Sequence, residues 1–382
     1  MNVLIIGIDG YIGWSLALHL LDRGFSVFGI DNFKRRDYAN SAIPIANMKN
    51  RLNAVKDNYN KRIEFFNIDV SNRVRYEELK QIFISIKPQT VIHLGEIPSA
   101  AYSMIDAWRA TEVQINNIIG TLNILYCMKE TCPDTHLVKL GTMGEYGTPN
   151  VDIPEGFFEI EYNNRKDRLP FPKQAGSWYH QSKVHDTNNI MMACRIWGLR
   201  STDVMQGVVY GTNVLEVSDE RLYTRLDFDE CFGTVIHRFC CQAVIEYPLT
   251  VYGNGNQKRG FLPLSDALQC LTLSIENPPV KGEYRTLNQF DEVYSVLELA
   301  QRVKKICKND GIDVLINNIK NPRVEKESHY YNPEHKLLFD LGYSPLKDLD
   351  GQIQSMLSAL SGYTTKIEEE KECLFPKTSW KN

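Results

Sequence analysis

Residues 3–13 read Val-Leu-Ile-Ile-Gly-Ile-Asp-Gly-Tyr-Ile-Gly, and they carry the clearest structural signal in the chain. The apolar run Val3–Ile6 is typical of a short buried strand, and Trp14–Leu21 is typical of an apolar helix that ends at Gly24. Glycines between such a strand and helix let the backbone approach a pyrophosphate, whose charge the helix N-terminus favours. The spacing is GxxGxxG, and its flanking elements predict a dinucleotide-binding turn rather than merely a tight one.

An acidic residue follows the next predicted strand. Ser26–Ile30 predicts that strand, and Asp31 stands at its end, about twenty residues after the glycines. A carboxylate at this place accepts hydrogen bonds from the adenosine ribose and repels a 2′-phosphate, which favours NAD over NADP. Lys34, Arg35 and Arg36 leave other interpretations open, because an arginine can also receive a 2′-phosphate, stack on adenine or belong to a solvated basic loop.

Strands and helices continue to alternate through the first half of the chain. Further strands are predicted at Ile63–Phe66, Thr90–Leu94 and Leu137–Leu140, and a long helical segment at residues 102–129. This alternation predicts a parallel, doubly wound α/β sheet whose ligands bind at the carboxyl ends of the strands. Asp69 follows the third strand, so we expect it near the adenine.

Composition sets limits on partners and location. The chain has 382 residues and a formal net charge of −4, which argues against a nucleic-acid or membrane partner held by bulk electrostatics. Its nine cysteines are odd in number and lack CxxC pairs, which indicates reduced thiols rather than disulfides or a metal site. No apolar run reaches the roughly eighteen residues that span a bilayer, and no basic leader precedes Val3. We therefore expect a cytoplasmic protein without a bound metal.

Tyr179 and Lys183 lie four residues apart, which places both side chains on one face of a helix. A free phenol has a pKa of about 10 and is a poor base at neutral pH, but a neighbouring ammonium lowers that pKa. Such a pair can remove a proton from a substrate hydroxyl while a hydride leaves the same carbon. Thr142, after the fifth predicted strand, can bond the same substrate oxygen. Residues 157–171 between them are typical of a hairpin, which would be a lid, a dimer contact or a plain loop.

The Tyr-x-x-x-Lys spacing alone is common by chance, but longer stretches of the chain agree with it. These stretches are Ala101–Asp106, Leu137–Ile153, Tyr179–Asp186, Gln206–Gly211, Pro248–Gly253 and Asn321–Glu325. Together with the glycine turn and Asp31, they resemble the extended short-chain dehydrogenase/reductase superfamily and, within it, the UDP-sulfoquinovose synthase family. The resemblance runs from residue 1 to Trp380 without a large gap.

The resemblance implies a domain organisation and a cofactor. Residues 1–211 would form mainly a Rossmann-type NAD-binding domain, and residues 212–382 mainly a smaller domain that binds the UDP-sugar, with some segments returning to the first domain. The residues that would bind NAD are Gly7, Asp9, Gly10, Tyr11, Ile12, Gly13, Asp31, Asn32, Arg35, Arg36, Asp69, Val70, Leu94, Gly95, Asn117, Lys183 and Gln206.

The resemblance also implies a reaction between UDP-glucose and sulfite, or sulfur from a sulfite-donating protein. Tyr179 would take the O4 proton, Lys183 would lower its pKa and hold the nicotinamide ribose, and Thr142 would steady O4. Oxidation at C4 acidifies the C5 proton, so a weak base can remove it, and the C6 hydroxyl leaves as water before sulfur adds. His180 and Glu145 are the candidates for base and acid, in either order.

On the substrate side, the resemblance places Arg259 and Arg323 on the diphosphate, where two guanidinium groups offer a fork geometry that lysine does not match. Ile97–Pro98 stands where plant relatives carry Gln-Arg, so an arginine beside the active-site strand is missing. A homodimer through segments 102–129 and 179–197 is the expectation for the superfamily. The implied substrate residues are Tyr102, Thr142, Gln206, Thr250, Tyr252, Arg259, Arg323 and Glu325.

Two other functions share parts of this pattern. A UDP-glucose 4-epimerase or 4,6-dehydratase needs the same oxidation but no sulfur nucleophile. Met143 argues against the dehydratase, because those enzymes carry an acid at this position. An NAD-binding regulatory or scaffold protein that has lost catalysis would not need Thr142, Tyr179 and Lys183, all of which are present.

Overall fold

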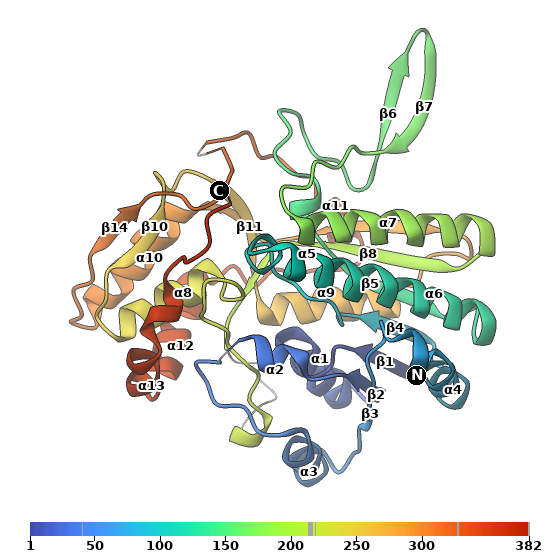
Figure 1. Ribbon diagram of the computed structural model, residues 1–382, viewed down its shortest axis with the longest axis horizontal. Coiled ribbons are helices and arrows are strands. Elements are labelled where there is room, and N and C mark those ends of the chain that lie inside the picture. Colours follow the sequence, from blue (N-terminus) through green and yellow to red (C-terminus); the bar gives the residue numbers. More distant parts are fainter. Residues whose placement is uncertain (40, 213–216, 218, 327, 381–382) are drawn as a thin grey trace.

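A parallel seven-stranded sheet runs through the computed structural model, which describes residues 1–39, 41–212, 217, 219–326 and 328–380 (Figure 1). Its strands lie in the spatial order β12-β8-β5-β4-β1-β2-β3, and each pairs in parallel with its neighbours. The order reverses between β1 and β4, which is the defining feature of the doubly wound α/β fold and confirms the expected class. In chain order the strands are β1 (Asn2–Ile6), β2 (Ser26–Asp31), β3 (Glu64–Asn67), β4 (Thr90–His93), β5 (His136–Thr142), β8 (Arg200–Gln206) and β12 (Tyr284–Gln289).

Helices cover both faces of this sheet, and β1 shows how the two layers arise. Val3 and Ile5 pack into one apolar core, whereas Leu4 and Ile6 pack into another, because successive side chains of a strand point to opposite faces. The first core includes α1 (Tyr11–Asp22), α3 (Met48–Tyr59) and α9 (Leu264–Glu276), and the second includes α4 (Tyr76–Ile86), α6 (Gly120–Thr131) and α7 (Trp178–Trp197).

The second half of the chain completes the sheet through β12 and also builds a core of its own, on the left in Figure 1. Two small sheets belong to it, one in the order β13-β11-β9 and one that pairs β10 with β14. Among the described residues, no helix is both long and apolar enough to cross a membrane. The remaining elements of this half are β9 (Val208–Tyr210), α8 (Val235–Val244), β10 (Leu249–Tyr252), β11 (Lys258–Pro263), β13 (Glu292–Ser295), α10 (Val296–Asn309), β14 (Ile316–Ile319), α11 (Lys336–Asp340) and α12 (Leu349–Ser361).

The long helical segment predicted at residues 102–129 is interrupted. A short 3-10 turn at Tyr102–Met104 leads into α5 (Ala107–Gln114), a π-helical turn at Ile115–Ile119 follows, and α6 continues from there. The π turn buries Asn116 and Asn117 against the end of β4, and such turns are frequent at functional sites.

The chain after residue 364 packs more firmly than its charged composition suggests. It forms α13 (Thr364–Glu369) and a 3-10 turn at Lys371–Leu374, and the side chains of Ile367 and Leu374 are fully buried. Two apolar residues among the charges therefore anchor this segment. Beyond this turn, the amide of Trp380 donates to the carbonyl of Pro322 at 2.9 Å.

The predicted hairpin forms from β6 (Phe157–Tyr162) and β7 (Arg165–Pro170), which pair antiparallel. It projects away from the rest of the molecule in Figure 1, and every residue of β7 is exposed. Its base is held by Phe158 and Phe171, which stack edge to face at 5.5 Å within a small core that also contains Met143.

The glycine turn is held in place by a buried ion pair. Gly7 has a φ of +89°, and a Cβ there would collide with the backbone of Leu94, so only glycine fits between β1 and β4. The carboxylate of Asp9 accepts from Arg51 Nη1 of α3 at 2.9 Å, and Arg51 also donates to the carbonyl of Tyr223 at 2.7 Å. Arg51 is fully buried, so this pair joins the glycine turn, α3 and the second half of the chain.

Replacing Arg51 with alanine should destabilise the protein by about 3–5 kcal/mol, because it leaves the buried carboxylate of Asp9 short of a partner. The free energy of unfolding in urea would measure this. Arg221→Ala is the control, since Arg221 pairs with Asp57 and Asp219 on the surface and should change stability little. Equal losses in the two variants would contradict the structural role of the buried pair.

Candidate active site

A cleft of about 390 Å³ opens at the carboxyl ends of the central strands. The glycine turn after β1 forms one end, and the Tyr179 helix α7 forms the other. Most of the residues predicted to bind the cofactor line this cleft. They are Gly7, Gly10, Tyr11, Ile12, Gly13, Asp31, Asn32, Arg35, Val70, Leu94, Gly95, Lys183 and Gln206.

Asp31 stands where the adenosine ribose is expected. Its carboxylate accepts from the backbone amides of Asp9 at 2.9 Å and Phe33 at 2.8 Å, which fixes its orientation at the end of β2. Burial, and then the neighbouring carboxylate of Asp9, raise the pKa of Asp31 to about 6. A ribose hydroxyl that donates to this carboxylate would fit such a half-buried acceptor.

The basic residues that follow Asp31 are all engaged by acids. Lys34 pairs with Asp69 at 2.8 Å, and Arg35 pairs with Asp227 at 2.5 Å. Arg36 binds Asp9 in bidentate fashion at 2.6 and 2.7 Å. A 2′-phosphate would have to displace a carboxylate from one of these pairs, so the site fits NAD better than NADP.

Four of the predicted cofactor residues lie outside the lining of the cleft and support its walls. Asp9 and Arg36 form the ion pair just described, and Asp69 accepts from Ser71 as well as from Lys34. Asn117 is fully buried, where it accepts from the amide of Ile97 at 2.9 Å and donates to Ser182 Oγ at 2.9 Å. It therefore ties the end of β4 to α7.

The helix α7 begins beside the end of β5, which brings the predicted catalytic residues together. Ser177 caps the helix, Tyr179 and Lys183 face the cleft from its first turns, and Thr142 faces it from β5. Lys183 Nζ donates to the carbonyl of Leu140 at 2.5 Å and lies 5.9 Å from the centre of the Tyr179 ring. This is the arrangement that the four-residue spacing predicts.

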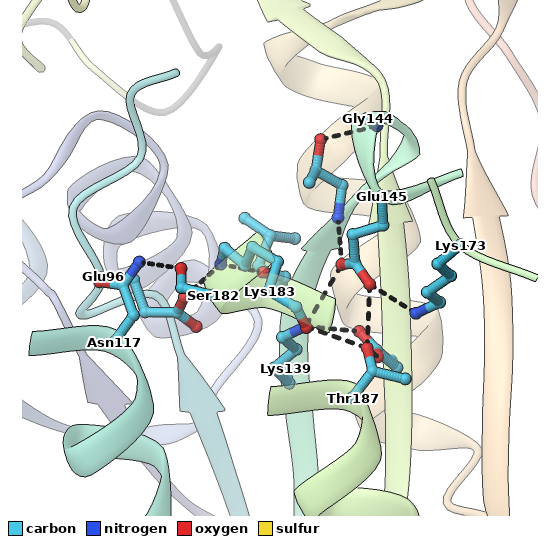
Figure 2. A network of polar contacts seen from close by, with 12 residues as sticks. Glu96, Asn117, Lys139, Gly144, Glu145, Lys173, Ser182, Lys183 and Thr187 are labelled. Carbon is cyan, nitrogen blue, oxygen red and sulfur yellow. Dashed lines mark hydrogen bonds and ion pairs between the residues drawn. The ribbon is translucent and has the colours of Figure 1, made fainter. Parts of the chain in front are cut away.

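Glu96 lines the cleft, although sequence reasoning did not single it out. It follows β4, is almost fully buried, and pairs with Lys183 Nζ at 2.8 Å (Figure 2). Burial, Glu96 and Glu145 raise the pKa of Tyr179 above its ordinary value. Lys183 was expected to lower that pKa, but the carboxylate of Glu96 offsets its charge. The one available signal was the position of Glu96 just after the predicted strand Thr90–Leu94.

Glu145 lies beneath the site rather than in it. The carboxylate has no exposed surface, and it accepts from the Thr142 amide at 3.1 Å, Thr187 Oγ1 at 3.1 Å and Lys173 Nζ at 2.5 Å (Figure 2). Burial alone would raise the pKa of this carboxyl, but Lys139 and Lys173 hold it down to about 2. Glu145 is thus a structural carboxylate that anchors the turn after β5.

His180 occupies the space over Gly144. A Cβ at that glycine would collide with Nε2 of the imidazole, so the absence of a side chain at 144 makes room for the ring. Nδ1 lies 3.0 Å from Ser177 Oγ, and the ring lines the cleft. Burial, and then Arg259 and Arg323, lower the pKa of His180 to about 4, so the imidazole is neutral at pH 7.

Met143 turns away from this space into a small apolar core with Tyr146 and Met205. It presents no acid or base to the cleft.

Three arginines gather near His180, outside the lining of the cleft. Arg259 pairs with Glu325 at 2.5 Å, and Arg323 lies over the rings of Tyr252 and Trp380. Sequence reasoning missed a third arginine, Arg238, whose Nη1 donates to the hydroxyl of Tyr252 at 3.0 Å. Arg238 lies on α8, and no sequence motif distinguished it.

Three further predicted substrate residues differ in whether their polar atoms already have hydrogen-bond partners. Thr250 is buried and binds Gln242, and the hydroxyl of Tyr102 donates to Glu112 at 2.7 Å. Gln206 lines the cleft, and its Oε1 is buried without a hydrogen-bond partner in the described part of the chain. Gln206 is therefore the one of these three that offers a free acceptor to a ligand.

Comparisons with known proteins agree with this geometry. The model of the NAD dependent epimerase/dehydratase family matches residues 3–288, so the chain belongs to that family and NAD is its cofactor. Two curated relatives narrow the assignment to the UDP-sulfoquinovose synthases. The chain is 45% identical to the UDP-sulfoquinovose synthase of Sulfolobus acidocaldarius, over 100% of this chain and 98% of that protein. It is 46% identical to the chloroplastic UDP-sulfoquinovose synthase of Spinacia oleracea, over 100% of this chain and 79% of that protein.

Solved structures share the fold. A UDP-glucose 4-epimerase from Thermotoga maritima, with UDP-glucose, has a TM-score of 0.72 and 19% identity, covering 96% of this chain and 99% of that one. A UDP-glucuronic acid 4-epimerase from Bacillus cereus, with UDP-glucuronic acid and NAD, has a TM-score of 0.71 and 20% identity, covering 95% and 99%. At these identities the likeness concerns the fold alone.

Proposed function

We propose that this chain catalyses the synthesis of UDP-sulfoquinovose from UDP-glucose and sulfite, by transient oxidation at C4. The observation that carries the proposal is the pairing of His180 with Gly144 beside Thr142 and Tyr179. It supplies a neutral base near Thr142 and Tyr179, whereas the carboxylate of Glu145 is buried outside the lining of the cleft. Relatives with this name match the whole chain, which supports the same reading.

The residues of the cleft fit NAD. The glycine turn leaves room for a pyrophosphate, Asp31 offers a ribose acceptor, and the basic residues after it are already paired. Lys183 and Gln206 face the nicotinamide end. When bound, NAD⁺ provides the acceptor for the C4 hydride and the source from which it returns.

Tyr179 and Thr142 act on the sugar hydroxyl at C4. Tyr179 accepts the O4 proton, and Thr142 holds O4 in line through its own hydroxyl. Tyr179 gives the proton back when the carbonyl is reduced at the end of the cycle. Lys183 is held between Leu140 and Glu96, so it stays in contact with this end of the cleft throughout.

His180 acts on C5 and C6. Its neutral imidazole removes the C5 proton, which the carbonyl at C4 has made acidic, and the C6–O bond breaks as the hydroxyl takes up a proton and leaves as water. The sulfur of sulfite then forms a bond to C6, and C5 is protonated again. Glu145 takes no part in this proton transfer, because both its oxygens are committed to buried partners.

Arg259 and Arg323 bind the diphosphate of the nucleotide, and Arg238 supports them through Tyr252. The sulfur source is sulfite or a protein that delivers it.

The cytoplasm is the proposed location, because all nine cysteines carry free thiols. One relative, from Spinacia oleracea, is named as chloroplastic.

A homodimer is part of the proposal. The helices α5, α6 and α7 lie side by side in Figure 1, and the segment from α5 to α7 exposes large apolar side chains. Contiguous exposed apolar surface marks an interaction site. These side chains are Trp108, Ile115, Tyr126, Met192 and Ile196.

Sedimentation equilibrium should give twice the chain mass of 43.9 kDa, because a second copy would cover these exposed apolar side chains. Ile196→Asp should shift the protein toward the monomer. Tyr162→Asp, at the exposed hairpin, is the control and should leave the mass unchanged. A monomeric wild-type protein would contradict the proposed dimer.

Incubation of the purified protein with UDP-glucose, NAD⁺ and sulfite should yield a nucleotide sugar with a sulfonate at C6, identified by mass spectrometry. Tyr179→Phe should abolish its formation by removing the base, while UDP-glucose still binds. UDP-galactose as the sole product would instead indicate an epimerase, and a 4-keto-6-deoxy sugar would indicate a dehydratase. Either result rejects the proposed function.

His180→Asn should separate the two halves of the reaction. Oxidation at C4 should continue, seen as NADH absorbance when UDP-glucose is added, but the C5 hydrogen should no longer exchange with deuterated water, because its base is gone. Gln181→Ala, one residue away, is the control and should keep both activities. If Glu145→Gln loses the exchange instead and His180→Asn keeps it, the assignment of the base is wrong.

A further inference from the structure

Lys183 does not face Tyr179 as an isolated cation. Glu96 Oε2 lies 2.8 Å from Lys183 Nζ, and both side chains are almost completely buried, with 1% and 4% exposure. The carbonyl of Leu140 accepts from the same ammonium at 2.5 Å. The carboxylate therefore fixes the position of Nζ and cancels most of its charge in a place where water does not screen it.

The other ionisable groups around this pair are already neutral or paired elsewhere. His93 of β4 is fully buried, and burial lowers the pKa of its imidazole to about 4. The carboxylate of Glu96 opposes this effect but does not overcome it. Asp186 of α7 has a pKa well above its ordinary value, first through burial and then through Glu96, so it holds its proton. His180, also of α7, is neutral as described.

Lys139 of β5 lies 3.4 Å from Glu145 and 3.5 Å from Asp203 of β8, and Lys173 pairs with Glu145. These four side chains, two cations and two carboxylates, therefore balance one another beneath the cleft. Of the carboxylates in this buried set, Glu96 is the one whose partner is Lys183.

We propose that Glu96 is a positioning residue for the reaction: it fixes Lys183 and offsets its charge, and so sets the pH at which Tyr179 becomes an active base. In the oxidation step, the C4–H bond breaks as hydride passes to NAD⁺, and the O4–H proton passes to the phenolate of Tyr179. A cation left uncompensated beside the phenol would stabilise the phenolate, so Tyr179 would release its proton at lower pH but would hold the O4 proton less firmly.

The test is the pH dependence of NAD⁺ reduction on mixing holoenzyme with UDP-glucose in the absence of sulfite. Rates rise with pH as Tyr179 loses its proton, and removing the charge of Glu96 should move this rise about one pH unit or more toward acid. Asp186 can ionise when Glu96 is neutralised and so mask the change. The decisive comparison is therefore between the double variant Glu96→Gln/Asp186→Asn and the single variant Asp186→Asn. The single variant should keep the wild-type midpoint.

A structural lesion would lower the rate at every pH without moving the midpoint, and that result, or coincident profiles, would overturn the proposal. Glu96→Asp should restore the wild-type midpoint, because the charge returns. A second readout needs no turnover: the tyrosinate absorbance of each protein, minus that of its Tyr179→Phe counterpart, should show the same acid shift.

This inference rests on the proposed role of Tyr179. Different experimental results would reject the role of Tyr179 and the role of Glu96. If Tyr179→Phe still reduces NAD⁺, the proposed function is wrong. If Tyr179→Phe is inactive but the midpoints coincide, only the role of Glu96 is rejected.

Discussion

The substrate side of the cleft depends on lysines that are buried with carboxylates. Lys139 has no exposed surface and lies between Glu145 and Asp203, and Lys183 is held by Glu96. Taking an ion out of water costs several kcal/mol, which is offset only when a partner of opposite charge is held at close range. These pairs join β4, β5, β8 and α7, so the backbone positions that present Thr142, Tyr179 and His180 are set together.

The same arrangement keeps the carboxylate of Glu145 apart from the side chains that line the cleft beside α7. The carboxylate of Glu145 lies beneath the cleft, whereas Tyr179, Thr142 and His180 line it with a phenol, a hydroxyl and a neutral imidazole. Gly144 leaves the space that the ring of His180 occupies, and Met143 packs into a small apolar core.

Sequence reasoning predicted the fold well because the relevant signals are local. The glycine turn, the apolar strands and the four-residue spacing of Tyr179 and Lys183 each appear within a few positions. It could not reveal the tertiary partners of the site residues. Glu145 was a candidate acid or base, but its buried lysine partners Lys139 and Lys173 became visible only in the fold. The basic residues after Asp31 looked available, but acids as distant as Asp227 engage them.

The central claim is that one site oxidises C4, acts on C5 and C6, and then reduces C4 again. The most direct measurement uses UDP-glucose deuterated at C4, with sulfite in ordinary water, and analyses the product by mass spectrometry and NMR. The account predicts a C6 sulfonate that retains deuterium at C4, together with solvent deuterium at C5 when unlabelled substrate reacts in deuterated water. A sulfonated product that has lost the C4 label, or one whose C5 hydrogen never exchanges, would contradict it.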